Sequence, residues 1–186
     1  MRQSYEHYRD SWYEQRKRSL LLGALTQPYY RRAFEPGCAY ANLTAALAQR
    51  CDDVVAVDCD PATVARAREI MGLRRNVYIS TMRVPQEWPP GHFDLVVLGE
   101  FLYYLPPPEI RRVAEHAAAS LLEGGELVAC HSRRAVADTG LSGDDVHTEL
   151  HAALPLKHVF RHQESDFVLE TWWQERCALA ACEGWR

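Results

Sequence analysis

The sequence lacks the long apolar runs that membrane and secreted proteins carry. No segment reaches the roughly 18 consecutive apolar residues of a transmembrane helix, and the first ten residues, MRQSYEHYRD, contain no apolar stretch of a signal peptide. Extended basic clusters are also missing, because residues 16–18 and 74–75 form only short ones and the formal net charge is -4. We therefore expect a cytoplasmic protein that binds neither membranes nor nucleic acid.

Signals for a disulfide framework are scarce as well. The chain has six cysteines but no C-x-x-C pair, and four of the six lie in apolar segments. A reduced thiol in such a segment packs as a small hydrophobic group. We interpret the cysteines as structural.

What the chain does have is the composition of a globular domain. It has 186 residues, of which 47% are apolar and 25% charged, with no internal repeat and no proline-rich stretch long enough to be a linker. Helical spacing over residues 5–25 predicts a helix that precedes the rest. We expect a single domain over residues 1–186, with residues 1–27 as an N-terminal cap helix.

Buried-strand runs and helical patterns alternate after that helix. Asp60 as N-cap, Pro61 at the first helical position and Gly72 at the end delimit one predicted helix. Apolar residues from Ile110 to Leu121 predict another, with the glycine pair 124–125 as its stop. The predicted strands cover residues 32–35, 53–58, 77–80, 93–99 and 126–131.

This alternation predicts an α/β fold, a doubly wound and mostly parallel sheet with right-handed crossovers. A polar helix is expected near residues 143–153, and the runs 158–164 and 167–175 lie close enough in sequence to form an antiparallel hairpin. Seven strands result. In such sheets ligands bind outside the carboxyl ends of the strands.

The end of the first strand carries the clearest binding pattern. Glu35, Pro36 and Gly37 lead from that strand into a helix, and Asp58 ends the next strand. A glycine there lets the backbone approach a ligand closely, and an acid at the neighbouring strand end can bind both hydroxyls of a ribose. The pattern indicates a nucleoside-bearing cofactor; an ordinary tight strand-to-helix turn is the alternative.

The sequence also resembles the class I S-adenosylmethionine-dependent methyltransferases, and within them the group typified by the nodulation-factor N-methyltransferase. The resemblance runs over nearly the whole chain, through segments SWYEQRK, FEPGC, AVDCDPATVARAR, FDLVVLGEFLYYL, EGGELVACHSR and GDDVH. It implies the seven-stranded class I methyltransferase fold with an antiparallel hairpin added to five parallel strands. It also implies S-adenosyl-L-methionine as the cofactor.

The resemblance further implies where that cofactor lies. Glu35 matches the residue at its methionine end, Gly37 and its neighbours match the loop that passes under it, and Asp58 matches the ribose-binding acid. The predicted cofactor-binding residues are Glu35, Gly37, Cys38, Ala39, Asp58, Cys59, Arg83, Val84 and Gly99.

Three positions depart from the family pattern. Ala41 stands where the family usually has glycine, Ala39 where it often has a small residue or glycine, and Arg83 replaces an acid that contacts the adenine amino group. A methyl group at either alanine is tolerated at negative φ but clashes at positive φ. The backbone amide near Val84 is an alternative contact for the adenine, which would leave Arg83 to solvent.

Candidate catalytic residues follow the fourth and fifth strands. Glu100 and Tyr104 come directly after the fourth strand, where a carboxylate and a phenol can hold and orient an amine. The fifth strand ends at His131, and His147 follows in the polar segment. One of these two histidines is a candidate general base, with structural, hydrogen-bonded histidines as the alternative.

A metal site at His131, His147 and His151 is conceivable by spacing, but methyl transfer from a sulfonium needs no Lewis acid, and we predict none. We expect SN2 transfer of a methyl group to an amine of a sugar or another small metabolite. A small-molecule hydroxyl is the rival acceptor, and an inactive scaffold subunit, motivated by Ala39, Ala41 and Arg83, is a rival function. The oligomeric state stays open.

Overall fold

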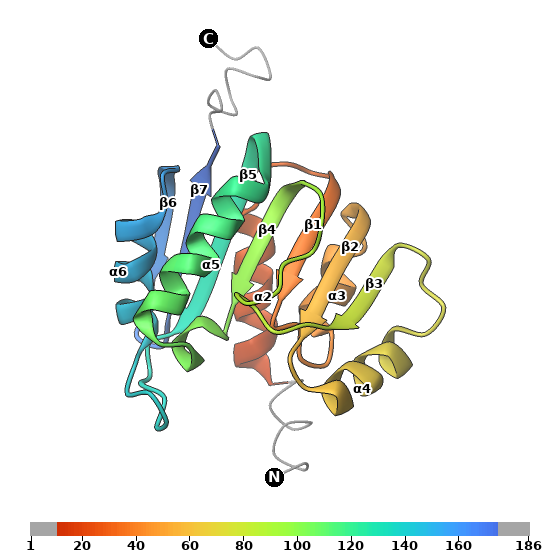
Figure 1. Cartoon of the computed structure of the whole chain (residues 1–186), viewed down its shortest axis with the longest axis horizontal. Coiled ribbons are helices and arrows are strands. Elements are labelled where there is room, and N and C mark those ends of the chain that lie inside the picture. Colours follow the sequence, from red (N-terminus) through yellow and green to blue (C-terminus); the bar gives the residue numbers. More distant parts are fainter. Residues whose placement is uncertain (1–10, 175–186) are drawn as a thin grey trace.

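The computed structural model describes residues 11–174, and their strands form one seven-stranded sheet. The strand order is β3-β2-β1-β4-β5-β7-β6, in which β1 to β5 run parallel and β7 is antiparallel to both of its neighbours (Figure 1). The elements are α2 (Trp12–Ala24), β1 (Tyr30–Pro36), α3 (Asn42–Leu47), β2 (Cys51–Asp58), α4 (Pro61–Met71), β3 (Val77–Thr81), β4 (Phe93–Gly99), η1 (Leu102–Tyr104), α5 (Pro107–Ser120), β5 (Leu121–Ser132), α6 (Gly143–Ala153), β6 (Lys157–Gln163) and β7 (Phe167–Trp173). This confirms the predicted doubly wound sheet and its C-terminal hairpin.

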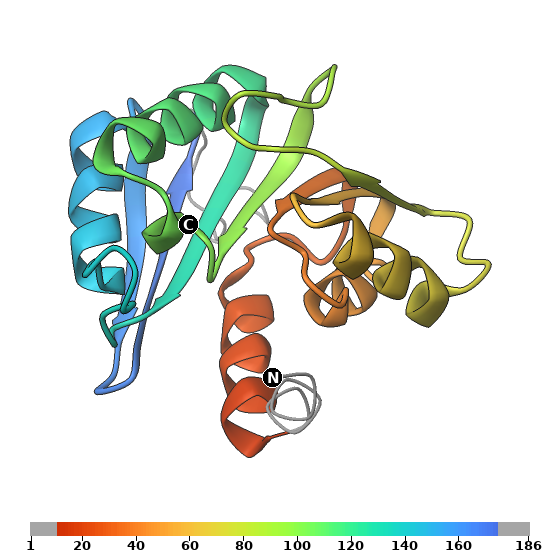
Figure 2. The same ribbon diagram turned by 60° about the horizontal axis from the view of Figure 1, so that its bottom comes forward.

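Helices cover both faces of the sheet. Leu21 and Leu25 of the α2 segment pack with Leu95, Val97 and Val128 on one face, where α3 and α4 also lie. The opposite face is covered by α5 and α6, and Figure 2 shows α2 on the other side of the sheet from these two helices. Of the predicted N-terminal cap helix, the structure shows a helix over Trp12–Ala24; residues 25–27 are not helical, and residues 1–10 lie outside the described range.

Two helix starts follow the predicted signals. The Asp60 side chain accepts hydrogen bonds from the backbone amides of Ala62 and Thr63, with Pro61 at the first helical position of α4. Ser142 and Asp145 form a reciprocal capping box at the start of α6. The capping box fixes where α6 begins, and α6 packs against β5 and β7.

One predicted boundary is wrong. The apolar spacing extended the helix to Leu121 and used Gly124–Gly125 as its stop, but α5 ends at Ser120 and β5 already begins at Leu121. Leu121 pairs with Phe93 of β4, and the register shifts before Leu95 pairs with Glu126. Gly124 has a φ of 74°, so the glycines bend the early part of the strand and do not cap a helix.

The four described cysteines are free thiols, of which Cys38, Cys51 and Cys130 are buried and Cys59 is exposed. Cys177 and Cys182 lie outside the described residues. Within residues 11–174, no helix has both the length and the apolar composition to cross a membrane.

Candidate active site

The loop after β1 lies against the end of β2. The backbone amides of Gly37 and Cys38 both donate to the Val57 carbonyl, at 2.8 and 3.0 Å. Gly37 has a φ of 73°, and a Cβ added there would lie 2.8 Å from the Cβ of Phe101, which follows β4. Only glycine fits there, because its backbone has positive φ and packs directly against the Phe101 side chain.

Both alanines of this loop adopt left-handed backbone conformations. The φ angle is 46° at Ala39 and 61° at Ala41, and Ala41 is the N-cap of α3 without a side-chain hydrogen bond. The loop therefore keeps the turn that glycine would favour, although a left-handed L-residue costs about 1–2 kcal/mol. Negative φ, the conformation that accommodates a methyl group without strain, is not adopted at either position.

Glu35 occupies the end of β1 and is buried. Its Oε2 atom has no hydrogen-bond partner among the described residues. Burial raises the pKa of Glu35 to about 7, and Thr44 offsets this only in part. A carboxylate in this state suits a cationic ligand group, because an ammonium ion would supply both the missing donor and the missing charge.

Asp58 is oriented by two backbone amides. Its Oδ2 accepts from the amide of Ala39 at 3.1 Å and its Oδ1 from the amide of Asp60 at 3.0 Å. The carboxylate therefore bridges the loop after β1 and the start of α4. Each oxygen keeps a further lone pair, which is what binding a diol requires.

Other predicted cofactor residues lie close to Asp58. The Met82 amide donates to the Asp58 carbonyl at 3.0 Å, which places the segment with Arg83 and Val84 beside the end of β2. Arg83 is exposed, and its backbone amide donates to the Glu87 carboxylate. Cys59 is exposed as well.

At the end of β4, Glu100 pairs with residues of the protein itself. Its backbone is left-handed, with a φ of 57°, and its Oε2 accepts a 2.6 Å hydrogen bond from the Tyr103 hydroxyl. Lys17 of α2 lies 3.3 Å from its other oxygen and 2.9 Å from Glu14. Burial alone would lower the pKa of Lys17, but the two carboxylates outweigh burial and raise it, so the ammonium stays charged.

Tyr104, the tyrosine predicted to act on the acceptor, is more than half exposed, with its ring 4.9 Å from that of Tyr103. Gly99 ends β4 opposite Cys130 of β5. After the end of β4, the Tyr103 hydroxyl therefore contacts Glu100, and Tyr104 lies at the surface. Sequence reasoning did not identify Lys17, because it lies between Arg16 and Arg18 in the polar part of α2 and no local pattern sets it apart.

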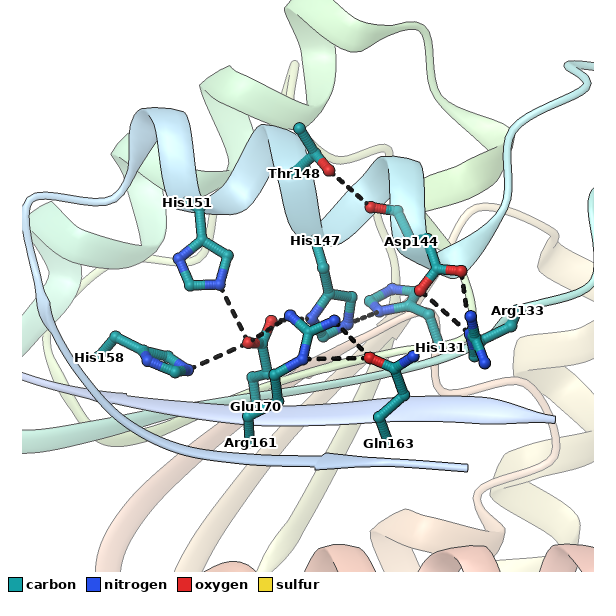
Figure 3. Close-up of polar contacts among 10 residues, drawn as sticks. All are labelled: His131, Arg133, Asp144, His147, Thr148, His151, His158, Arg161, Gln163 and Glu170. Carbon is teal, nitrogen blue, oxygen red and sulfur yellow. Dashed lines mark hydrogen bonds and ion pairs between the residues drawn. The ribbon is translucent and has the colours of Figure 1, made fainter. Parts of the chain in front are cut away.

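Beyond Glu100, the two predicted histidines form a buried row with a third residue (Figure 3). Nδ1 of His131 lies 3.2 Å from Nε2 of His147, and Nδ1 of His147 lies 2.5 Å from Oε2 of Glu170. The three residues come from β5, α6 and β7, and each is at most 1% exposed. Sequence reasoning missed Glu170, whose signal was a single acidic residue in the mostly apolar run FVLETWW.

His131 Nε2, at the inner end of the row, has no hydrogen-bond partner among residues 11–174. The Tyr103 ring meets the His131 ring edge-on, with the centroids 5.6 Å apart. Burial, then His147 and Lys17, lower the pKa of His131 well below its ordinary value. His131 is therefore neutral near pH 7, with one ring nitrogen unused.

The outer oxygen of Glu170 faces three further side chains. His151, His158 and Arg161 approach Oε1 at 3.0, 3.1 and 2.9 Å. The two histidines and Glu170 are near enough to one another to hold a metal ion, and this is not the trio that spacing suggested. The Arg161 guanidinium already supplies the positive charge at that oxygen, so we assign no metal to the cluster.

Comparison with known proteins gives the class. Residues 33–125, half of the chain, match the family model for a methyltransferase domain, and the protein belongs to this family. The match includes the loop after β1, the end of β2 and the end of β4, and the observed sheet is the class I methyltransferase fold.

More particular likenesses lie in the nodulation-protein group. Nodulation protein S of Sinorhizobium fredii is 33% identical over 111 residues, which are 59% of this chain and 51% of that protein. N-methyltransferase NodS of Bradyrhizobium japonicum, crystallised with S-adenosyl-L-homocysteine, is 25% identical with a TM-score of 0.78 over 90% of each chain. A Pseudomonas syringae protein assigned as a methyltransferase is 39% identical, with a TM-score of 0.79 over 88% of this chain and 99% of its own.

The curated relatives also include a carboxy-S-adenosyl-L-methionine synthase from Trichlorobacter lovleyi, 30% identical over 125 residues, which are 63% of this chain and half of that protein. The chain spans about half the length of the curated relatives it matches. The resemblance read from the sequence motifs is thereby confirmed.

Proposed function

We propose that this protein transfers a methyl group from S-adenosyl-L-methionine to an amine of a sugar or another small metabolite. The observation that carries the proposal is the buried Glu35 carboxylate, whose Oε2 has no hydrogen-bond partner among the described residues and which lies beside the glycine loop of a methyltransferase-family fold. The methionine part of the cofactor carries an ammonium group that suits this carboxylate. The complex of NodS with S-adenosyl-L-homocysteine supports the choice of cofactor.

The residues that would hold the cofactor lie along the ends of β1, β2 and β3. Glu35 would bind the ammonium group, the backbone at Gly37 would pass beneath the cofactor, and Asp58 would accept hydrogen bonds from the ribose hydroxyls. The amide near Val84 would contact the adenine. When bound, the cofactor supplies a methyl group made electrophilic by the positive sulfonium.

On the acceptor side, the protein positions the nucleophile. Glu100 and Tyr104 lie at the end of β4 and would orient an amine, and His131, supported by His147, would accept its proton at Nε2. Positioning in line with the methyl group supplies most of the rate enhancement, and proton acceptance adds to it. Because Lys17 already balances Glu100, the carboxylate would bind the amine as a hydrogen-bond acceptor more than as its counter-ion.

Two kinds of alternative have specific support. One kind keeps the same cofactor-binding residues but changes what is modified. It comprises a hydroxyl acceptor and the chemistry of the carboxy-S-adenosyl-L-methionine synthase relatives. A binding subunit without transfer activity is favoured by the strained alanines of the loop. The two kinds are separated by whether the cofactor binds and by what is then modified.

The test uses the whole chain. Calorimetry with S-adenosyl-L-homocysteine measures cofactor binding, and thermal stabilisation by about 2.7 kcal/mol is expected at a concentration 100 times the dissociation constant. A panel of amine and hydroxyl metabolites with radiolabelled S-adenosyl-L-methionine then identifies the acceptor. Absent binding supports the scaffold alternative, and labelling confined to hydroxyl compounds rejects an amine acceptor.

A further inference from the structure

We propose that Glu170 acts through His147 to hold His131 in the tautomer whose Nε2 carries a lone pair. Glu170 and His147 are then positioning residues, and Nε2 of His131, which is buried in the structure without ligands, is the atom that would meet the acceptor. The inference rests on the proposed methyl transfer only for its consequence, because the tautomer itself is a property of the protein without ligands.

The hydrogen-bond directions follow from the carboxylate end of the row (Figure 3). An ionised carboxylate only accepts, so the 2.5 Å contact requires a proton on Nδ1 of His147. A neutral imidazole carries one proton, so Nε2 of His147 is then an acceptor. It can meet Nδ1 of His131 at 3.2 Å only if that nitrogen carries the proton, which leaves Nε2 of His131 with a lone pair.

The premise that Glu170 is ionised has independent geometric support. Arg161 lies 2.9 Å from its outer oxygen, with His151 and His158 at similar distances. Burial alone would raise the pKa of Glu170, but hydrogen bonds from His147 and His151 outweigh it and lower the pKa to about 2. The negative charge is therefore held at the outer end of the row throughout the neutral pH range.

The premise that both histidines are neutral follows from burial. Burial lowers the pKa of His147 despite the opposing effect of Glu170, and burial lowers the pKa of His131 well below its ordinary value. The charged or titratable groups that face His131 are His147 from α6, Tyr103 from η1 and, at longer range, Lys17 from α2. None of these is a carboxylate, so none favours a proton on its Nε2.

This arrangement fits the proton balance of amine methylation. The amine lone pair forms the new N–C bond while the C–S bond pair stays on sulfur, which leaves a positive ammonium product. One N–H bond of that product breaks, its electron pair returns to nitrogen, and the proton forms an N–H bond at Nε2 of His131. Glu170 then faces the resulting positive charge through His147, in the manner of the carboxylate of a Ser-His-Asp triad.

The direct test is ¹⁵N NMR of histidine-labelled protein without ligands. Long-range ¹H–¹⁵N correlations distinguish the two neutral tautomers, and the expected pattern has protons on Nδ1 of both His131 and His147. A proton on Nε2 of His131 in the natural protein would overturn the inference. This readout needs no acceptor, so it holds even if no methyl transfer is found.

Substitution supplies the second readout. Glu170→Gln removes the charge but keeps the shape, and we expect kcat to fall by about 100-fold or more, with unchanged affinity for S-adenosyl-L-homocysteine and a changed tautomer ratio at His131. Glu170→Asp should recover part of the rate. Glu164→Gln is the matched control, because Glu164 also binds a histidine and an arginine, His162 and Arg16, but lies outside the row. Equal rates for Glu170→Gln and Glu164→Gln would overturn the positioning role.

Discussion

The two halves of the carboxyl edge of the sheet differ in which groups they present: one presents loop backbone, and the other presents buried polar side chains. Around β1 and β2, the loop offers backbone held in left-handed conformations at Gly37, Ala39 and Ala41. Around β5 and β7, the same edge offers buried side chains that bond to one another, His131, His147 and Glu170. In the proposed function, the first half would bind the methyl donor and the second would meet the acceptor.

We therefore expect substitutions around β5 and β7 to lower the rate of methyl transfer, and substitutions around β1 and β2 to lower the affinity for the cofactor. His131→Asn should lower kcat by about 10²- to 10⁴-fold, because a general base is lost, and leave the affinity for S-adenosyl-L-homocysteine unchanged. Because the pKa of His131 is lowered, the natural rate should hold as pH falls to about 6.5 and decline only below it. Single-turnover experiments measure the rate, and calorimetry measures the affinity. A near-normal rate in the His131→Asn variant would show that His131 is not the base.

The converse effect is expected at Asp58. Asp58→Ala should weaken cofactor binding by about 1.5–3 kcal/mol, which is roughly 10- to 150-fold, since hydrogen bonds to a charged group are lost. At saturating cofactor, kcat should change little. Asp53→Ala, at a partly buried acid of the same strand, is the matched control. Equal calorimetric affinities for the two variants would take Asp58 out of the site.

Glu35 predicts that protons are released when the cofactor binds, which gives a further test of the first half. Its folded pKa of about 7 lies above the ordinary value, so its carboxyl is mostly protonated at pH 6. The bound ammonium group should lower that pKa, and binding at pH 6 should release up to about 0.9 proton per protein. Calorimetry in buffers of different ionisation enthalpy measures this number, and Glu35→Gln should reduce it to near zero. The same release in both proteins would point to another group.

The raised pKa of Glu35 also makes the stability of the fold depend on pH. A carboxyl whose folded pKa is raised favours the fold below its unfolded pKa, near 4.5, and loses that contribution as pH rises through about 7. Without ligand, denaturant midpoints of the natural protein should therefore fall relative to those of Glu35→Gln between pH 5 and 8. A constant difference across that range would contradict the raised pKa.

The smallest effects concern the two alanines. Ala39→Gly should raise the free energy of unfolding by about 0.5–1 kcal/mol, because glycine adopts positive φ without strain. Ala41→Gly should be nearly neutral, since Ala41 is fully buried and losing a methyl group costs about 0.8 kcal/mol. Urea titrations of both variants measure the contrast. A destabilised Ala39→Gly protein would mean that the left-handed turn carries no strain.

Sequence reasoning predicted how the ends of β1 and β2 lie together better than it predicted the contacts of β5, α6 and β7, and the reason is distance along the chain. Glu35, Gly37 and Asp58 belong to consecutive strand ends, and parallel topology alone brings such ends together. The strand Phe93–Gly99 and the helix Gly143–Ala153 were predicted with their observed bounds. The start of β5 was missed because the pairing of Leu121 with Phe93 overrode the helical spacing.

The acceptor half depends on pairings that periodicity does not encode. Glu170 reaches His147 only because β7 is inserted between β5 and β6, with Ala129 opposite Glu170. Lys17 reaches Glu100 only because α2 packs under the end of β4. The sequence patterns show that each element exists but do not specify which side chains meet across the sheet.

The insertion of β7 also has a consequence for the order in which a growing chain can assemble. All the residues proposed for the cofactor lie before Ser132, whereas His131 obtains its supporting carboxylate only when residue 170 has left the ribosome. Until then, the outer edge of β5 is unpaired, and the histidines of the row have no negative charge beside them. A nascent chain would thus acquire the parts that hold a methyl donor well before the parts that help to use it.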